Sequence, residues 1–329
     1  MSEYIMECKT VQTGVFKTLV EALKDILTDI NIEFHKGNSE SPNDDEKGYI
    51  KIVALDSTVN IMVHLKLEGA RFESYYCKRR MLVGVSMMYF HKLIKTISNS
   101  NDCLTLYIAE NDENKLGIKI ENSEKNSVTN YKLNLMDIKY DDINIPPQKF
   151  DNIISMPSDD FQKICKDMNN LAEIIEIKNV GNKLIFACSG DFADQETVCS
   201  EHSGLKFDKM NDSHEVIQGY YNLRQLVLFT KCTHLSNSVE MFIKNDFPLI
   251  IQYKVGSLGC LKLILAPKVK ENYFAFVFAH FARIFPILQL SAIIFSEYDN
   301  IPNSFLHIRS GLFVSGKQLV VFSNNCFPS

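Results

Sequence analysis

Basic residues recur in pairs along the chain at two spacings that suit binding to a phosphate backbone. The pairs are Lys17 and Lys24, Lys92 and Lys95, Lys163 and Lys166, and Arg224 and Lys231. Each pair is separated by seven or three residues, and on an α-helix both spacings return to about the same face. Such a face binds phosphates without reading bases. The pattern therefore predicts a sequence-independent nucleic-acid surface; the alternative is four ordinary solvated helix faces, where basic residues are common.

The net charge of the whole chain is negative, opposite in sign to these basic pairs. The chain has 329 residues, a formal net charge of −5 and no tryptophan, and its calculated pI is about 5.9. Bulk charge alone argues against a nucleic-acid partner, but only the face that meets the partner matters. We therefore expect a positive strip on a negative body.

Patterns typical of catalysis are weak. The eight histidines show neither an HExxH motif nor a paired metal spacing. Ser189-Gly190-Asp191 lacks the glycine-flanked turn of a hydrolase nucleophile. Asp159 and Asp160 are better explained as the first turn of a helix whose N-cap is Ser158. We expect no catalytic residue, no metal and no cofactor, while an enzyme with a site that these patterns do not reveal stays an alternative.

The basic pairs fall on four segments with helical periodicity, set among segments that alternate as strands. The expected helices are 11–29, 86–97, 158–171 and 222–234. The expected strands are 4–10, 49–55, 58–67, 72–76, 103–109, 115–121, 128–136, 151–156, 173–179, 183–188, 194–200, 203–208, 214–218, 237–244, 248–254 and 260–265. The same order therefore occurs twice: helix, strands, helix, strands. The chain is predicted to be α+β, with two topologically similar domains.

A connector separates the two halves. It follows the strand near Tyr131 and ends at Pro146-Pro147, where two adjacent prolines resist both helix and central strand. The expected parts are an N-terminal domain 1–133, the connector 134–150, a C-terminal domain 151–269 and an extension 270–329.

Several segments resemble the proliferating cell nuclear antigen family, the eukaryotic sliding clamps of DNA replication. They are VEALKDIL (20–27), ALDST (54–58), INIPP (143–147), MPSDDFQKICKDM (156–168), ACSGDF (187–192), LFTKCTHLSNSVEM (228–241) and FPLIIQYKVGSLGCLKLILAPK (247–268). The resemblance runs in order over roughly residues 6–269. It implies the DNA clamp fold, in which two like domains per subunit, each with two helices packed on antiparallel sheets, form a three-subunit ring.

The resemblance also implies residue roles. The positions that match the family's basic inner face, toward duplex DNA, are Lys17, Lys24, Arg79, Lys92, Lys95, Lys163, Lys166, Arg224 and Lys231. The positions that match its outer pocket for client motifs are Leu55, Val59, Ile143, Ile145, Pro146, Pro248, Ile264, Ala266, Pro267 and Lys268. The matching subunit edges are about 127–135 and 192–200, with Tyr131, Leu133, Phe192 and Val198.

Two positions depart from the family's pattern in this pocket. Val59 stands where the family often has histidine, and Ile264 stands where it commonly has tyrosine. The pocket is therefore more aliphatic, and its preference among client motifs is left open.

The partners implied are duplex DNA bound without sequence preference, DNA polymerase and other proteins with clamp-binding motifs, an ATP-dependent clamp loader, and two further copies of the chain. The absence of a P-loop motif is consistent with opening by a separate ATPase. The alternative is a non-catalytic, checkpoint-type or accessory paralogue acting as an interaction hub in a hetero-oligomer. The expected location is the nucleus, or a cytoplasmic viral factory if the protein is viral.

The extension does not match the family. Residues 273–295 are long and apolar enough to span a membrane by length, but His280, Arg283 and Pro286 interrupt them. We therefore expect no membrane partner, and favour a tail that folds on the body or hooks a neighbouring molecule. Gln289 with Phe295 faintly resembles a client motif.

Overall fold

The structure is a computed structural model that describes residues 3–37, 48–98, 101–139, 143, 150, 152–209, 216–268, 312–315 and 318–321. The chain divides into two compact units, Met1–Val277 and Phe278–Ser329. In the second unit the described residues are strands β19 (Leu312–Ser315) and β20 (Gln318–Val321), which pair antiparallel. The apolar segment 273–295 lies outside the described residues. In the part of the chain that is described, no helix is both long and apolar enough to cross a membrane.

The first half of the larger unit has the predicted order of helices and strands, with two strands, Asp29–His35 and Met81–Ser86, that the sequence patterns did not predict. Its elements are β1 (Tyr4–Thr10), α1 (Thr13–Leu23), β2 (Asp29–His35), β3 (Tyr49–Leu55), β4 (Ile61–Glu68), the 3₁₀ turn η2 (Gly69–Arg71), β5 (Ser74–Cys77), β6 (Met81–Ser86), α2 (Met87–Ile94), β7 (Cys103–Ala109), β8 (Asp112–Asn122) and β9 (Ser127–Asn134).

The second half repeats the order. Its elements are β10 (Asn152–Pro157), α3 (Ser158–Asn169), β11 (Ile174–Val180), β12 (Lys183–Ser189), β13 (Asp194–Ser200), β14 (Lys206–Lys209), β15 (Ile217–Asn222), α4 (Leu223–Phe229), the 3₁₀ helix η3 (Thr230–Leu235), β16 (Ser238–Phe242), β17 (Leu249–Val255) and β18 (Gly259–Leu265). The predicted α+β class is confirmed.

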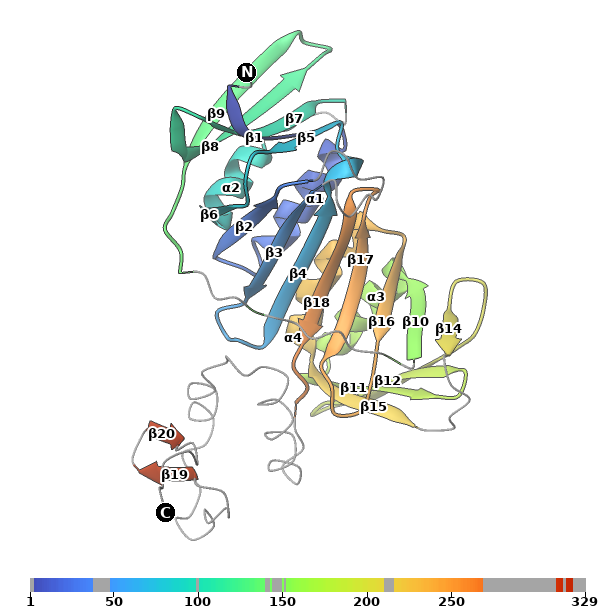
Figure 1. Cartoon of the computed structure of the whole chain (residues 1–329). Coiled ribbons are helices and arrows are strands. Elements are labelled where there is room, and N and C mark those ends of the chain that lie inside the picture. Colours follow the sequence, from blue (N-terminus) through green and yellow to red (C-terminus); the bar gives the residue numbers. More distant parts are fainter. Residues whose placement is uncertain are drawn as a thin grey trace. The chain divides into compact units, whose positions relative to one another are not determined.

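One sheet is shared by both halves. Its nine strands follow the order β14-β10-β16-β17-β18-β4-β3-β2-β6, so the halves meet where β18 pairs with β4 (Figure 1). Two smaller sheets complete the unit, with the orders β5-β1-β7-β8-β9 and β13-β12-β11-β15. In each half the helices pack on the large sheet, because its strands alternate buried residues on the helix side with less buried residues on the other.

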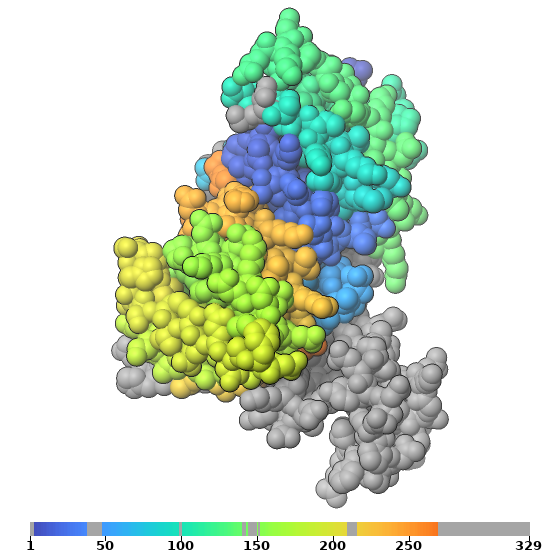
Figure 2. Space-filling model, turned by 180° about the vertical axis from the view of Figure 1, so that it is seen from behind, coloured from blue at the N-terminus to red at the C-terminus, as the bar shows by residue number. Residues whose placement is uncertain are grey.

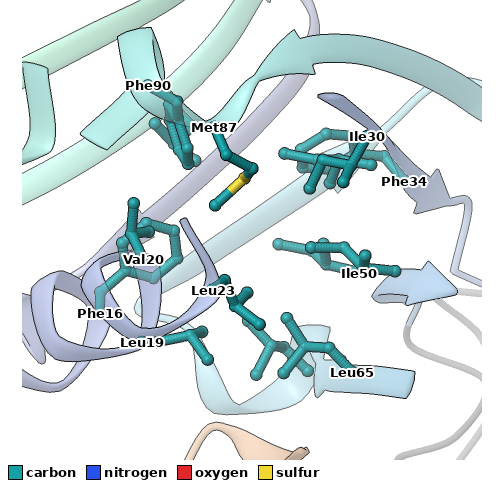
Figure 3. A pocket seen from close by; sticks show the side chains of 14 residues that line it. Phe16, Leu19, Val20, Leu23, Ile30, Phe34, Ile50, Leu65, Met87 and Phe90 are labelled. Atoms are coloured by element: carbon teal, nitrogen blue, oxygen red, sulfur yellow. The ribbon is translucent and has the colours of Figure 1, made fainter. Parts of the chain in front are cut away.

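The core of the first half shows why these helices form. Phe16, Leu19, Val20 and Leu23 recur at helical spacing on α1 and, with Leu65 of β4 and Phe90 of α2, line one apolar space (Figure 3). The space that they leave is about 20 Å³ and is lined only by apolar side chains. Room for about one water molecule, without polar partners, makes this a packing gap and not a ligand site.

All four expected helices are shorter than predicted, the first and the fourth by the most. The first ends at Leu23, and the chain enters β2 at Asp29, because Ile30, Ile32 and Phe34 alternate and bury one face in the sheet. The fourth is α-helical only to Phe229 and continues as the 3₁₀ helix η3. The expected N-cap at Ser158 is wrong: the helix starts at this residue, and its hydroxyl donates to the carbonyl of Ser236 at 2.7 Å instead.

Candidate nucleic-acid interface

The basic residues of the two halves meet at one carboxylate. Asp25, just after α1, accepts hydrogen bonds from Lys24 at 2.8 Å and from Lys231 of η3. Burial by itself would raise the pKa of Asp25, but the two ammonium groups outweigh it and lower that pKa. In the view from behind, the dark-blue segment of α1 and the gold-to-orange segment of α4 and η3 lie together (Figure 2). The ion pair therefore joins the two halves on the helix side.

Most of the other helix cations are exposed to solvent. The exposed ones are Lys92 of α2, Lys95 directly after α2, Lys163 and Lys166 of α3, and Arg224 of α4. The ammonium of Lys92 lies 5.5 Å from the centre of the Tyr89 ring, which is itself exposed. These side chains can reach phosphate oxygens without first breaking an ion pair with another described residue.

Two of the expected DNA-facing residues have other structural roles. The ammonium of Lys17 donates to the carbonyl of Ile97 at 2.8 Å, which satisfies a backbone acceptor beyond the end of α2. Arg79 lies in the turn between β5 and β6 and pairs with Glu113 of β8 at 2.5 Å. That contact ties Arg79 to the five-stranded sheet and not to a helix.

The expected client residues gather along one end of the large sheet, on the face opposite the helices. Strand register places Leu55 opposite Met62, Met62 opposite Ile264, and Ile264 opposite Ile250. Met62 and Ile250 therefore also belong to this surface. Sequence reasoning did not predict them, although both take part in the alternation of their strands. Ile143 is described and half-buried, whereas Ile145 and Pro146 lie outside the described residues.

A tight turn borders this surface. The carboxylate of Asp56 accepts from the amides of Asn60 at 2.9 Å and Ile61 at 2.7 Å. Val59 within the turn has a φ of 59°, which is uncommon for a β-branched residue. The amide of Ala266 donates to the carbonyl of Asn60 at 3.0 Å, so the turn and the end of β18 are held together. Pro248 is buried beside this end, and Pro267 and Lys268 are half-buried.

The start of the connector is fixed to β6 and β2. The amide of Met136 donates to the carbonyl of Gly84 at 2.9 Å, and the side-chain amide of Asn31 donates to the carbonyl of Ile138 at 3.1 Å. A Cβ at Gly84 would lie 2.1 Å from the Met136 carbonyl oxygen. Glycine is therefore required for this close approach.

The two expected subunit edges are edge strands of their sheets. β9 ends the five-stranded sheet, and β13 ends the four-stranded sheet. Tyr131 and Leu133 are half-buried and pack on the core, whereas Phe192 is 77% exposed and Val198 is 48% exposed. A cavity of about 330 Å³ lies between α3 and β13 and is lined by side chains that include Lys163 and Cys199.

Metal and thiol chemistry find no support among the described residues. No group of three or more His, Cys, Asp or Glu side chains in that part of the chain is placed to hold a metal ion. Burial raises the pKa of the Cys8 and Cys232 thiols to about 12, so these buried cysteines are poor nucleophiles.

Two like halves, one shared sheet and helices that carry outward cations define a two-domain clamp fold. The chain belongs to the proliferating cell nuclear antigen family: the model of that antigen's N-terminal domain matches residues 5–143, and the model of its C-terminal domain matches residues 144–268.

Viral proteins are among its relatives. The chain is 33% identical to the "Probable DNA polymerase sliding clamp 1" of Paramecium bursaria Chlorella virus 1, over 80% of this chain and 97% of that protein. It is 30% identical to the "Probable DNA polymerase sliding clamp" of Acanthamoeba polyphaga mimivirus, over 80% of this chain and 62% of that protein.

Proposed function

We propose that this protein is a sliding clamp that encircles duplex DNA and tethers DNA polymerase, which raises processivity. The observation that carries the proposal is the set of exposed cations on helices of both halves, on one side of the shared sheet. A ring holds DNA by topology, so weak and sequence-independent phosphate contacts are sufficient and keep the clamp mobile. This activity requires no catalytic step.

Three copies are proposed to close the ring by pairing β9 of one subunit with β13 of the next. An unpaired sheet edge is a liability unless another strand covers it. The edges are complementary in charge, because β9 exposes Lys132 and β13 exposes Asp194 and Glu196. Pairing of two different edges is head-to-tail, which closes into a ring when the rotation fits.

The proposed partners are DNA polymerase, other replication and repair factors with clamp-binding motifs, and an ATP-dependent clamp loader. The names of the viral relatives support the polymerase, and the surface around Leu55 and Ile264 supports client docking. Replacing Ile143 and Ile145 by serine should weaken client-peptide binding without unfolding the protein. Tight binding by that variant would refute the client surface. The proposed location is the site of DNA replication, in the nucleus or a viral factory.

The deciding experiment measures the solution mass of the full chain by light scattering, and then its retention on DNA. A mass of three subunits is expected. After loading by the cognate clamp loader with ATP, the ring should stay on a nicked DNA circle and be lost when the circle is linearised. Equal retention on circular and linear DNA would refute topological binding. A monomeric mass would favour the accessory paralogue in a hetero-oligomer.

A further inference from the structure

The outer face of the large sheet, opposite the helices, presents side chains in rows that cross the strands. The first row, which we call the apolar row, consists of Leu55, Met62, Ile264, Ile250 and Phe242. Met62 and Ile264 are buried, at 3% and 7% exposed, whereas Leu55, Ile250 and Phe242 are half-buried and are the accessible members of the row. Val63 and Leu263, the chain neighbours of Met62 and Ile264, face the core, so the row belongs to the other face.

The next two rows are basic at their centre, and each holds one carboxylate farther along: Glu240 in the first, two strands from Lys262, and Glu33 in the second, opposite Lys51. His64 lies opposite Lys262, and in the following row Lys51 lies opposite Lys66. We call these four residues the outer patch. Like charges directly opposite each other in an antiparallel pair are destabilising. Neither Lys51 nor Lys262 forms an ion pair with another residue that the structure describes, because Glu33, which lies opposite Lys51, pairs with Arg80 instead.

The charges of the outer patch act on one another. Burial is the largest cause that lowers the pKa of His64, to about 4, and the charges of Lys262, Lys51 and Lys66 lower it further. The ammonium of Lys66 lies 5.3 Å from the centre of the Tyr49 ring, and that of Lys262 lies 5.9 Å from the centre of the Phe242 ring. Aromatic side chains thus border the cations, and the outer patch concentrates positive charge in a protein whose net charge is −5.

We infer that the outer patch binds an acidic segment of a client protein whose apolar anchor lies on the apolar row. This inference rests on the proposed function for the location of the client. Successive rows on one face of a strand are two residues apart, about 7 Å. An extended peptide that runs along the strands has the same period. Its side chains at alternate positions therefore meet the three rows in turn, and the matching pattern is apolar-x-acidic-x-acidic.

A peptide fits this surface better than a nucleic acid. A phosphate backbone offers no apolar group for the apolar row, whereas a peptide offers apolar and acidic side chains at the required period. The exposed cations proposed to face duplex DNA lie on the helix side of the sheet. We therefore assign duplex DNA to the helix side of the sheet and the acidic peptide to its outer face.

The test uses the full chain and a short fluorescein-labelled peptide with one Leu-Phe pair followed by alternating glutamate and serine. A companion peptide has glutamine in place of glutamate. Binding is followed by fluorescence anisotropy for the wild type and for the double variant K51Q/K262Q. The matched control is K125Q/K183Q, which removes two exposed lysines from other sites. Thermal unfolding and solution mass are measured for each variant.

The wild type should bind the glutamate peptide more tightly than the glutamine peptide. In K51Q/K262Q, binding of the glutamate peptide should weaken about threefold to thirtyfold, as expected for two partly exposed ion pairs. The control should bind as the wild type does. Equal weakening in the control, or no preference for glutamate, would overturn the inference. Displacement of the peptide by a short DNA duplex would assign the outer patch to nucleic acid instead. None of these results depends on ring closure or DNA loading.

Discussion

The two faces of the large sheet carry the same kinds of charge in different arrangements. On the helix side, Lys24 and Lys231 share the counter-charge of Asp25, and Lys17 binds a backbone carbonyl. On the outer side, the cations stand in strand register beside an apolar row. Partly neutralised and dispersed charges suit a phosphate backbone that must slide. Charges in register beside apolar side chains suit a peptide held in one place.

The largest expected effect comes from reversing charge on the helix side alone. The combined variant K24E/K92E/K166E/R224E should lose DNA retention and polymerase stimulation, because the surface would then repel phosphate. Its solution mass and its affinity for the acidic peptide should stay as in the wild type, since neither depends on these helices. Unchanged polymerase stimulation would refute the assignment of this face to DNA. The reversals K125E and K183E, at exposed positions off the helices, serve as controls.

A smaller effect is expected at the connector, which borders the outer face. Gly84→Ala places a Cβ against the Met136 carbonyl, so the connector or β6 must shift. We expect a loss of about 1–3 kcal/mol in the free energy of unfolding, as for other overpacked sites. Weaker binding of a client peptide should accompany it, with DNA retention unchanged.

The matched control for Gly84 is Gly14→Ala on α1, where no atom lies within 4 Å of the added Cβ. Because alanine favours helix over glycine, this variant should gain up to about 1 kcal/mol. Urea unfolding measures both variants. Equal stability of the two would show that the close approach at Gly84 has no energetic consequence.

Local patterns predicted most of the fold. β7 and β13 have the bounds expected from alternation alone. β2 was missed because the apolar stripe of the first helix was extended through Asp29, although Ile30, Ile32 and Phe34 alternate. These residues form a strand and do not extend the helix, because residues 30–34 bury one face in the shared sheet.

Local sequence patterns predicted the candidate sites less well than the fold. Helix spacing located the exposed cations of α2 and α3, but not the partner of Lys231, because Asp25 is 206 residues away in the chain. The apolar row depends on the register of four strand pairs from both halves, which no single segment encodes. The glycine at position 84 has no sequence signal beyond its own identity.

Removing the counter-charge should make the helix side bind DNA more strongly. Asp25→Asn frees Lys24 and Lys231, and the affinity for duplex DNA should rise about twofold to fivefold, the range expected for one partly exposed ion pair. Asp167→Asn is the control, because Asp167 is an exposed carboxylate of α3 that forms no ion pair with another described residue. Fluorescence anisotropy at low salt measures both. An equal gain in DNA affinity for Asp167→Asn would mean that the net charge of the protein, and not the release of Lys24 and Lys231, determines the affinity.

The same pair predicts a pH dependence. The folded pKa of Asp25 is lowered, so the ion pair stabilises the fold above the unfolded pKa of about 3.9. That stability is lost as the pH falls through the folded pKa. The difference in unfolding free energy between wild type and Asp25→Asn should therefore shrink below about pH 4. A difference that persists there would mean that the carboxylate acts through packing and not through charge.

The smallest effect tests whether the cations of the outer patch act on one another. In the wild type, titration of His64 by NMR should give a pKa of about 4. Lys262→Gln should raise this value, because the variant removes the cation that acts most strongly on the ring. The pKa should stay below the ordinary value of about 6.5, since burial is the larger cause. Lys254→Gln, on the neighbouring strand, should leave it unchanged.

The sign of the linked stability follows from which state binds the proton. Between about pH 4 and pH 6.5 the unfolded chain protonates His64 and the folded protein does not. The fold therefore loses stability as the pH falls through that window, and Lys262→Gln should lose less. Bound acidic peptide should raise the pKa of His64 in the wild type by supplying the missing negative charge. If the peptide bound without shifting that pKa, its carboxylates would lie away from the outer patch, and the two faces of the sheet would differ less than their registers indicate.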